Sequence, residues 1–217
     1  GVTHYDSTGN WWFDEAHVYI AYYCHRMSFY LMDAITRSSE AYLYTGDPKN
    51  GRVAAILLDR FADFYPTYDI KPYAYFTEAN HGGFDTGRLW GCLYEGEKDL
   101  AWAESYDAIF DLYEDEFVLE YLREKSKEIK MTHAKETPSQ IRTNIEDGIL
   151  REVIYSIMVD NRIHSNFGFV QASIAANAVA LDDSINTEAA LDWLISPGYI
   201  ETNPENGGGL LDYIITN

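Results

Sequence analysis

The chain has 217 residues and a formal net charge of −19 at pH 7, which argues against nucleic-acid binding because an acidic surface repels phosphates. Its hydrophobic content of 47% excludes a disordered chain and is enough for one sizeable core. No run approaches the roughly 18 apolar residues of a membrane-spanning helix, so we expect no membrane span. The two cysteines, Cys24 and Cys92, form no metal or redox motif, and we expect neither a metal nor a cofactor.

The first half of the chain carries two helical patterns and then one long irregular segment. The stretch "FYLMDAITRSSEAYLYTG" has apolar residues at helical spacing and ends at Gly46, a residue type common just after a helix. Asp47 and Pro48 then provide a cap and a first-turn proline for a second helix, which stops before Pro66. The two helices predict an antiparallel hairpin. Residues 66–96 show no period and are rich in Gly, Tyr, Pro and His, which predicts a long, ordered, functional loop.

Helical patterns dominate the second half as well. They resume at Asp99–Tyr113 and Glu116–Lys127 and, after the polar stretch "KMTHAKETPS", continue from Pro138 to about Val159. A helix rich in small residues, "FVQASIAANAVALDD", follows, and Thr187 is expected to cap a shorter one, "EAALDWLI". With a last helix starting at "LLDYIITN", the chain reads as about four helical hairpins with little strand signal. This pattern predicts an all-α protein built as a bundle, a solenoid or an (α/α) toroid.

Several stretches together resemble a known family. The stretch "YYCHRMSFYLMDAITRSSEAYLYTGDPKNGRVAAILLDRFADFYPTYD" resembles the N-terminal toroid of heparinase II/III-like polysaccharide lyases. The blocks "AESYDAIFD", "RTNIEDGILREVI" and "SNFGFVQASIAANAVALDD" match further parts of that family in the expected order. The resemblance implies a single α/α toroid domain, complete or incomplete, over residues 1–217, and a β-sheet domain that these residues lack. It also implies a periplasmic or extracellular protein whose signal peptide and catalytic tyrosine lie outside these residues, so that the chain is an inactive fragment.

By this resemblance, Asn166 is the residue that neutralises the substrate carboxylate. Such lyases cleave uronate-containing glycans by β-elimination, in which a proton leaves the carbon next to a carboxylate. A neutral amide donor near that carboxylate stabilises the developing charge, and one such donor contributes about 3–4 kcal/mol in other enzymes. His164 would transfer a proton or bind the carboxylate as imidazolium. The structural alternatives are Ser165 or Asn166 as the N-cap of a helix from Phe167, and His164 as a loop histidine.

Five further residues are candidates for the cleft. His25, in "YYCHR", resembles a family histidine that faces the cleft and is a third catalytic candidate, while its neighbours Tyr23 and Arg26 would bind the substrate. Packing is the alternative role of the tyrosine. In the long loop, "NHGGFDTGR" offers His81 as part of a cleft wall and Arg88 as a bidentate partner of a uronate or sulfate. The structural alternative is a loop in which Arg88 bridges to an acid.

Two other functions stay open at this point. Toroid glycoside hydrolases use a carboxylic acid and a carboxylate base, and no spacing favours any pair among five candidates: Asp33, Glu40, Glu95, Asp107 and Glu146. For Glu146, an i,i+4 ion pair with Arg142 is the ordinary expectation. The third function is that of a non-catalytic glycan-binding relative. We therefore expect a lyase-like protein that acts on an acidic polysaccharide or oligosaccharide, with these two alternatives.

Overall fold

The structure is a computed structural model, and its described residues are 3–5, 11–13, 15–68, 87–89, 92–131, 133–164, 167–198 and 207–216. Side chains are described in these ranges except for those of residues 3–28, 92–94 and 216. The described chain is helical apart from one antiparallel pair of short strands, β1 (Thr3–Tyr5) and β2 (Trp11–Phe13). The predicted all-α class is therefore confirmed.

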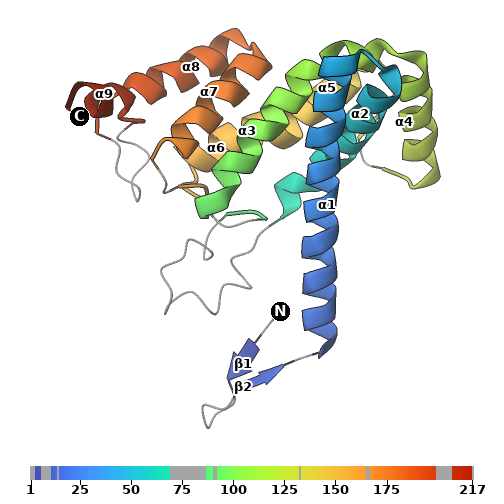
Figure 1. Ribbon diagram of the computed structural model, residues 1–217, viewed down its shortest axis with the longest axis horizontal. Helices are drawn as coiled ribbons and strands as arrows, with labels where there is room; N and C mark the ends of the chain where they lie inside the picture. The colour runs from blue at the N-terminus through green and yellow to red at the C-terminus, as the bar shows by residue number, and fades with distance from the viewer. Residues whose placement is uncertain are drawn as a thin grey trace.

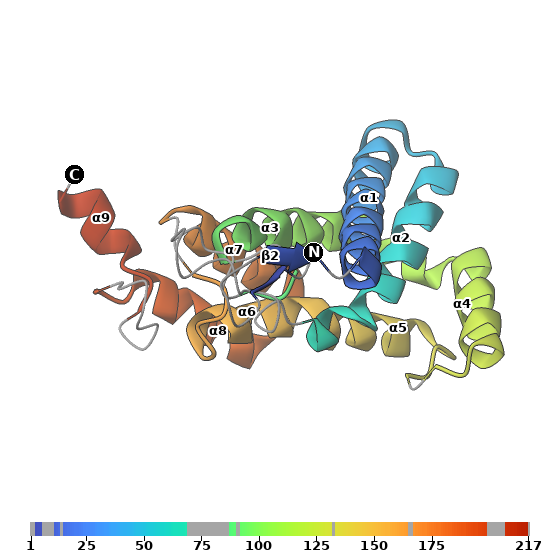
Figure 2. The same cartoon turned by 90° about the horizontal axis from the view of Figure 1, so that it is seen from below.

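The helices follow one another along most of the described chain. In order they are α1 (Glu15–Thr45), α2 (Pro48–Ala62), α3 (Cys92–Ala108), α4 (Glu116–Glu128), α5 (Pro138–Ile145), α6 (Arg151–Met158), α7 (Phe169–Leu181), α8 (Ser184–Ile195) and α9 (Leu210–Thr216). Two short 3-10 helices, η1 (Tyr65–Thr67) and η3 (Phe110–Glu114), and a π-helical turn, η4 (Glu146–Leu150), complete the set. Figures 1 and 2 show an elongated arrangement with α4 near one end and α9 at the other. Within the described ranges, no helix has both the length and the apolar character needed to cross a membrane.

The predicted hairpin of α1 and α2 is confirmed, and local signals explain it. Gly46 has a positive φ of 67°, and its N–H donates to the Tyr42 carbonyl at 2.8 Å, which ends α1. The Asp47 carboxylate then accepts from the Lys49 N–H at 3.0 Å, and Pro48 occupies the first turn of α2. The two helices lie side by side in Figure 1.

Two helix starts differ from the predicted ones, and a third helix has a different cap. α3 begins at Cys92, earlier than expected, and so takes in part of the segment that was predicted to be a loop. α8 begins at Ser184, because Asp183 accepts from two N–H groups of its first turn; Thr187 is not its cap. α7 begins at Phe169, with Gly168 as its N-cap at a φ of 102°. The prediction that Ser165 or Asn166 caps this helix is therefore wrong.

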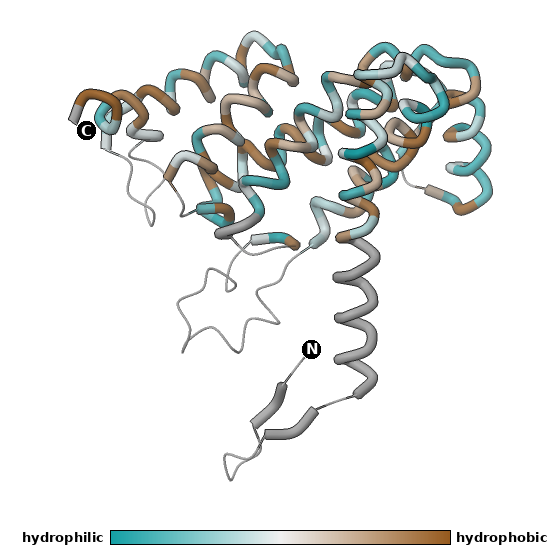
Figure 3. The backbone as a smooth tube through the Cα atoms, in the orientation of Figure 1, coloured by the Kyte–Doolittle hydropathy of each residue, from teal (hydrophilic) through white to brown (hydrophobic). Residues whose placement is uncertain are grey.

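The core forms around α3, which packs against both α1 and α7. Trp102 of α3 is buried, and its ring lies 4.7 Å from that of Phe61 and 5.2 Å from that of Tyr65. These edge-on aromatic contacts join α3 to α2 and η1, and they add to the stability gained from the buried area alone. At the other end of the protein, α9 is largely hydrophobic in Figure 3, and four of its hydrophobic side chains are exposed: Leu211, Tyr213, Ile214 and Ile215.

The long helix predicted from Pro138 is confirmed, but it contains a π-helical turn. α5, η4 and α6 follow one another without a break, and the Thr137 hydroxyl caps α5 by accepting from the Gln140 N–H at 3.2 Å. In η4, Gly148 packs directly on the end of α2: a Cβ at this position would lie 2.5 Å from the Ala62 carbonyl oxygen. This close approach requires glycine.

Candidate functional site

Arg88 holds together the region where η1, α3 and α6 meet. Its Nη1 donates to the carbonyl of Pro66 at 2.7 Å and lies 3.4 Å from that of Tyr68, while its Nε donates to the Ser156 hydroxyl at 3.1 Å. Its Nη2 forms an ion pair with Glu152. Arg88 is only 5% exposed, so its guanidinium is turned inward. This geometry supports the alternative in which Arg88 bridges to an acid, not the one in which it holds a substrate anion.

Glu95 secures the same region from the first turn of α3. Its Oε2 accepts from the backbone N–H of Arg88 at 2.7 Å and of Leu89 at 3.2 Å, and its Oε1 accepts from the Tyr65 hydroxyl at 2.8 Å. Glu95 is fully buried, at 0% exposure. We call residues 87–89, with Arg88 and Glu95 as their anchors, the neck, because they join the chain after η1 to the start of α3.

Asp99 lies one turn after Glu95 on α3 and was not identified from the sequence. Its side chain is also fully buried, and its Oδ1 lies 3.3 Å from the Tyr65 hydroxyl. Its Oδ2 has no hydrogen-bond partner in the part of the chain that the structure describes. Burial, and then the charge of Glu95, raise the pKa of Asp99 well above its usual value. Two buried carboxyl groups therefore share one tyrosine hydroxyl.

His164 lies at the end of a segment that is tied to the neck through Ser156. The carbonyl of Ser156 accepts from the N–H of Arg162 at 2.8 Å and of Ile163 at 3.1 Å, while its hydroxyl accepts from Arg88. The side chain of His164 is half-buried. Two of the candidate residues, Arg88 and His164, therefore belong to connected parts of the structure.

The other candidate residues cannot be placed in the same detail. Asn166 and His81 lie outside the described residues. Tyr23, His25 and Arg26 belong to α1, but their side chains lie outside what the structure describes. Their proposed roles therefore rest on the sequence.

The start of α7 packs between α3 and the residues before α9. The Gly168 N–H donates to the Gln171 side chain at 2.7 Å, and the Gln171 amide donates to the carbonyl of Gly208 at 2.9 Å. On the other side, a Cβ on Gly96 of α3 would lie 3.5 Å from the backbone of Phe169. We call residues 164–171 the "HSNFGFVQ" block. The neck and the described part of the "HSNFGFVQ" block thus both lie against the first turns of α3.

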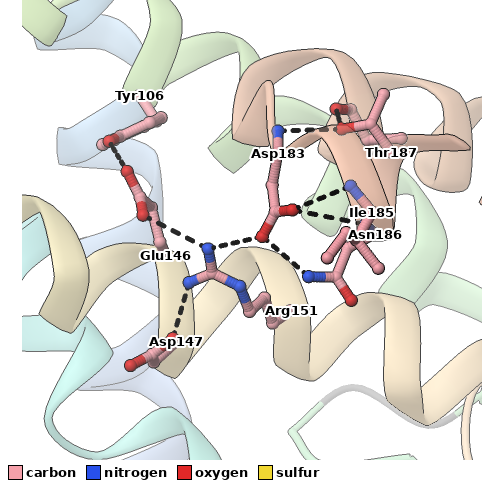
Figure 4. A network of polar contacts seen from close by, with 9 residues as sticks. Tyr106, Glu146, Asp147, Arg151, Asp183, Ile185, Asn186 and Thr187 are labelled. Atoms are coloured by element: carbon pink, nitrogen blue, oxygen red, sulfur yellow. Dashed lines mark hydrogen bonds and ion pairs between the residues drawn. The ribbon is translucent and has the colours of Figure 1, made fainter.

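The candidate Glu146 belongs to a different network, drawn in Figure 4. The Tyr106 hydroxyl donates to Glu146 at 2.9 Å, and Arg151 lies 3.5 Å from the same carboxylate, 2.6 Å from Asp147 and 3.1 Å from Asp183. Burial, followed by the charge of Glu146, raises the pKa of Tyr106 far above its usual value. Each carboxylate has a cationic or hydroxyl partner, so the network fixes η4 and α6 to α3 and α8.

The expected ion pair of Arg142 with Glu146 is wrong. Arg142 instead lies 2.9 Å from Glu114 and stacks over the ring of Phe110 at 4.3 Å, both of η3. The π-helical turn begins at Glu146 and alters the spacing of the side chains that follow α5, and Glu146 pairs with Arg151 inside the network of Figure 4.

Comparisons of the chain with protein-family models, curated proteins and solved structures gave no match. Among the described residues, no three histidine, cysteine or acidic side chains are grouped so as to hold a metal ion. The residues around the start of α3 and their geometry therefore carry the functional argument.

Proposed function

We propose that residues 1–217 are the helical part of a polysaccharide lyase that cleaves uronate-containing acidic glycans by β-elimination. The ordered sequence blocks support this proposal, because they resemble the toroid of heparinase II/III-like lyases. The observation that carries it is the meeting of the neck and the described part of the "HSNFGFVQ" block at the first turns of α3. In a toroid, functional loops gather at one end of the helices, and these two segments flank such an end.

An α/α toroid, complete or incomplete, is the finer architecture that belongs to this proposal. The antiparallel pair of α1 and α2 supports it, as do α7 and α8, which pack against each other along the chain. A periplasmic or extracellular location is part of the same proposal, since acidic glycans of this class occur outside the cytoplasm.

The chemistry assigns one step to each group. The Asn166 amide donates to the uronate carboxylate and so stabilises the charge that develops when the neighbouring carbon loses its proton. The glycosidic oxygen on the next carbon then leaves with a proton, and a carbon–carbon double bond forms. His164 and His25 are the proposed groups for proton transfer or carboxylate binding. His81, Tyr23 and Arg26 are the proposed groups that bind the glycan. Arg88 positions the neck and does not touch the substrate.

The test uses the full gene product and a panel of heparan sulfate, chondroitin sulfate, alginate and ulvan. A lyase produces an unsaturated sugar that absorbs in the ultraviolet, and this absorbance should appear with at least one glycan. Asn166→Ala should lower kcat by about 10²- to 10³-fold, the usual cost of removing one such donor. Asn50→Ala, on α2, is the matched control and should leave kcat unchanged.

Other results would replace the proposal by one of its alternatives. New reducing ends without ultraviolet absorbance would indicate a glycoside hydrolase with two carboxylates. Glycan binding without any turnover by the full gene product would indicate a non-catalytic relative. Unchanged turnover in Asn166→Ala, with an intact circular dichroism spectrum, would remove Asn166 from the mechanism.

A further inference from the structure

Within the part of the chain that the structure describes, the donors around the buried pair Glu95 and Asp99 suit one charged carboxylate better than two. Glu95 accepts from two backbone N–H groups and from the Tyr65 hydroxyl, which is the donor set of an ionised carboxylate. Asp99 has one contact, of 3.3 Å, to that same hydroxyl, and its Oδ2 has no partner among the described atoms. The two carboxyl groups therefore differ in state: the geometry suits an ionised Glu95 and a protonated Asp99.

The Tyr65 hydroxyl connects the two groups in one direction. It carries a single hydrogen, and Glu95 is the nearer acceptor, at 2.8 Å against 3.3 Å for Asp99. When the Tyr65 hydroxyl donates its hydrogen to the Glu95 carboxylate, the contact between Tyr65 and Asp99 can be a hydrogen bond only if a protonated Asp99 is the donor. The resulting chain runs from the Asp99 carboxyl to the Tyr65 oxygen and from the Tyr65 hydroxyl to the Glu95 carboxylate. Burial raises the pKa of Tyr65 well above its usual value, so the tyrosine stays neutral.

The described charges around the pair do not compensate a second carboxylate. The described groups that act electrostatically on Asp99 are Glu95 of α3, Tyr65 of η1 and Arg88 of the neck. Arg88 already forms an ion pair with Glu152 of α6. From α7, the uncharged Asn177 approaches the Asp99 backbone carbonyl at 3.5 Å. An ionised Asp99 would therefore be a second buried negative charge beside Glu95, with no cation to itself among the described side chains.

We propose that Asp99, Tyr65 and Glu95 form a pH-sensitive latch, which holds the neck against α3 while Asp99 is protonated and loosens when Asp99 loses its proton. Glu95 is the point of action, because it binds the N–H groups of Arg88 and Leu89 directly. Repulsion from an ionised Asp99 acts on the carboxylate that anchors the neck. The Asp99 carboxyl has its raised pKa only while the neck is closed. Closure is therefore favoured at low pH and weakens as the pH rises toward that pKa.

Hydrogen–deuterium exchange of the Arg88 and Leu89 amides tests the latch in the full protein. After correction for the intrinsic exchange rate, protection of these amides should fall as the pH is raised above the ordinary pKa of an aspartate, by up to about tenfold per pH unit until the raised pKa of Asp99 is reached. In Asp99→Asn the neutral amide still donates to Tyr65, and protection should change less than about twofold over the same range. Asp107→Asn, an exposed position of the same helix, should behave like the wild type. Equal loss of protection in Asp99→Asn and the wild type would overturn the latch.

A second measurement needs no variant. Infrared spectra of the wild type should show a protonated carboxyl band that persists above the ordinary pKa of an aspartate and disappears as the pH rises, together with the protection of the neck. The Asp59 carboxyl, whose pKa burial raises to about 6, titrates separately and is not coupled to the protection of the neck. Absence of the band throughout the pH range in which the neck is protected would show that Asp99 is ionised there and would also overturn the proposal. Neither hydrogen exchange nor infrared spectroscopy measures turnover, so these experiments test the latch independently of the lyase proposal.

Discussion

Replacing Lys135 by methionine should strongly destabilise the fold, because this residue supplies the cation of a buried polar cluster. Lys135 lies between α4 and α5, and its side chain is fully buried. Its Nζ is 2.5 Å from Asp59 and 3.1 Å from Asp63, both near the end of α2. Asn144 of α5 donates to the same Asp59 oxygen at 3.0 Å. The lysine thus pins the segment before α5 to α2.

The structure indicates the size of the effect. Removing one partner of a buried ion pair usually costs about 3–5 kcal/mol, because the other charge is left uncompensated. Here burial already raises the pKa of Asp59 to about 6 with the lysine present. In Lys135→Met, Asp59 therefore takes up a proton near neutral pH, which limits the loss to the lower end, about 3 kcal/mol. At about pH 5 the loss should be smaller still, because protonation of Asp59 then costs little.

Urea unfolding measures this loss as a midpoint about 1 M lower at pH 7. Lys127→Met is the matched control: this α4 lysine is exposed, pairs with Glu136 at 2.9 Å, and should leave the midpoint nearly unchanged. Adding Asp59→Asn to Lys135→Met should recover much of the loss, since no buried carboxylate then lacks a partner. Equal midpoints for Lys135→Met and Lys127→Met would refute the reasoning.

Two further predictions concern helix packing and acid stability. Gly148→Ala should lower the free energy of unfolding by about 1–3 kcal/mol, because its Cβ would meet the rigid Ala62 carbonyl at 2.5 Å. Gly96→Ala, whose Cβ would have its nearest neighbour at 3.5 Å, should raise the free energy of unfolding by up to about 1 kcal/mol. Similar urea midpoints for the two variants would contradict the close approach at Gly148. Bonds from the Asn186 side chain and Arg151 lower the pKa of Asp183 to about 2, so the stability it contributes is present above its ordinary pKa and is lost as pH falls toward 2. The stability difference between wild type and Asp183→Ala should therefore shrink through this range, and a constant difference would show that the charge is not involved.

Local signals predicted the elements whose ends depend on neighbouring residues. The run of Gly46, Asp47 and Pro48 ends one helix and starts the next through contacts within a few residues, so the sequence is sufficient there. The same holds for the predicted helix start at Pro138, where the adjacent Thr137 caps α5. By contrast, the start of α7 at Gly168 depends on a positive φ and on the packing of Gln171 against Gly208, which lies far along the chain.

Charged residues in the core were the main feature that sequence reasoning missed. Lys135 stands in a polar stretch, and Asp99 was assigned to a helix without a role, because burial of a charge depends on partners distant in sequence: Asp59 for the lysine and Tyr65 for the aspartate. The spacing of Glu95 and Asp99 by one helical turn was a usable signal. It was lost because α3 was expected to start at Asp99, which left Glu95 in a loop.

The π-helical turn η4 determines how this part of the protein responds to a change in chain length. An α-helix advances by about 100° per residue, so residues seven apart lie about 20° from each other around the helix axis and residues eight apart about 80°. Ile145 and Val153 lie eight residues apart and are both buried in the core, and the wider turn between them absorbs one residue, which brings the two side chains closer to one line along the helix. Deleting one residue within η4 would convert α5, η4 and α6 into one regular α-helix and would keep the side chains of Ile145 and Val153 on the core face. The turn thus acts as a local register adjuster that confines a one-residue length change to five positions and spares the alignment of α6 with α7.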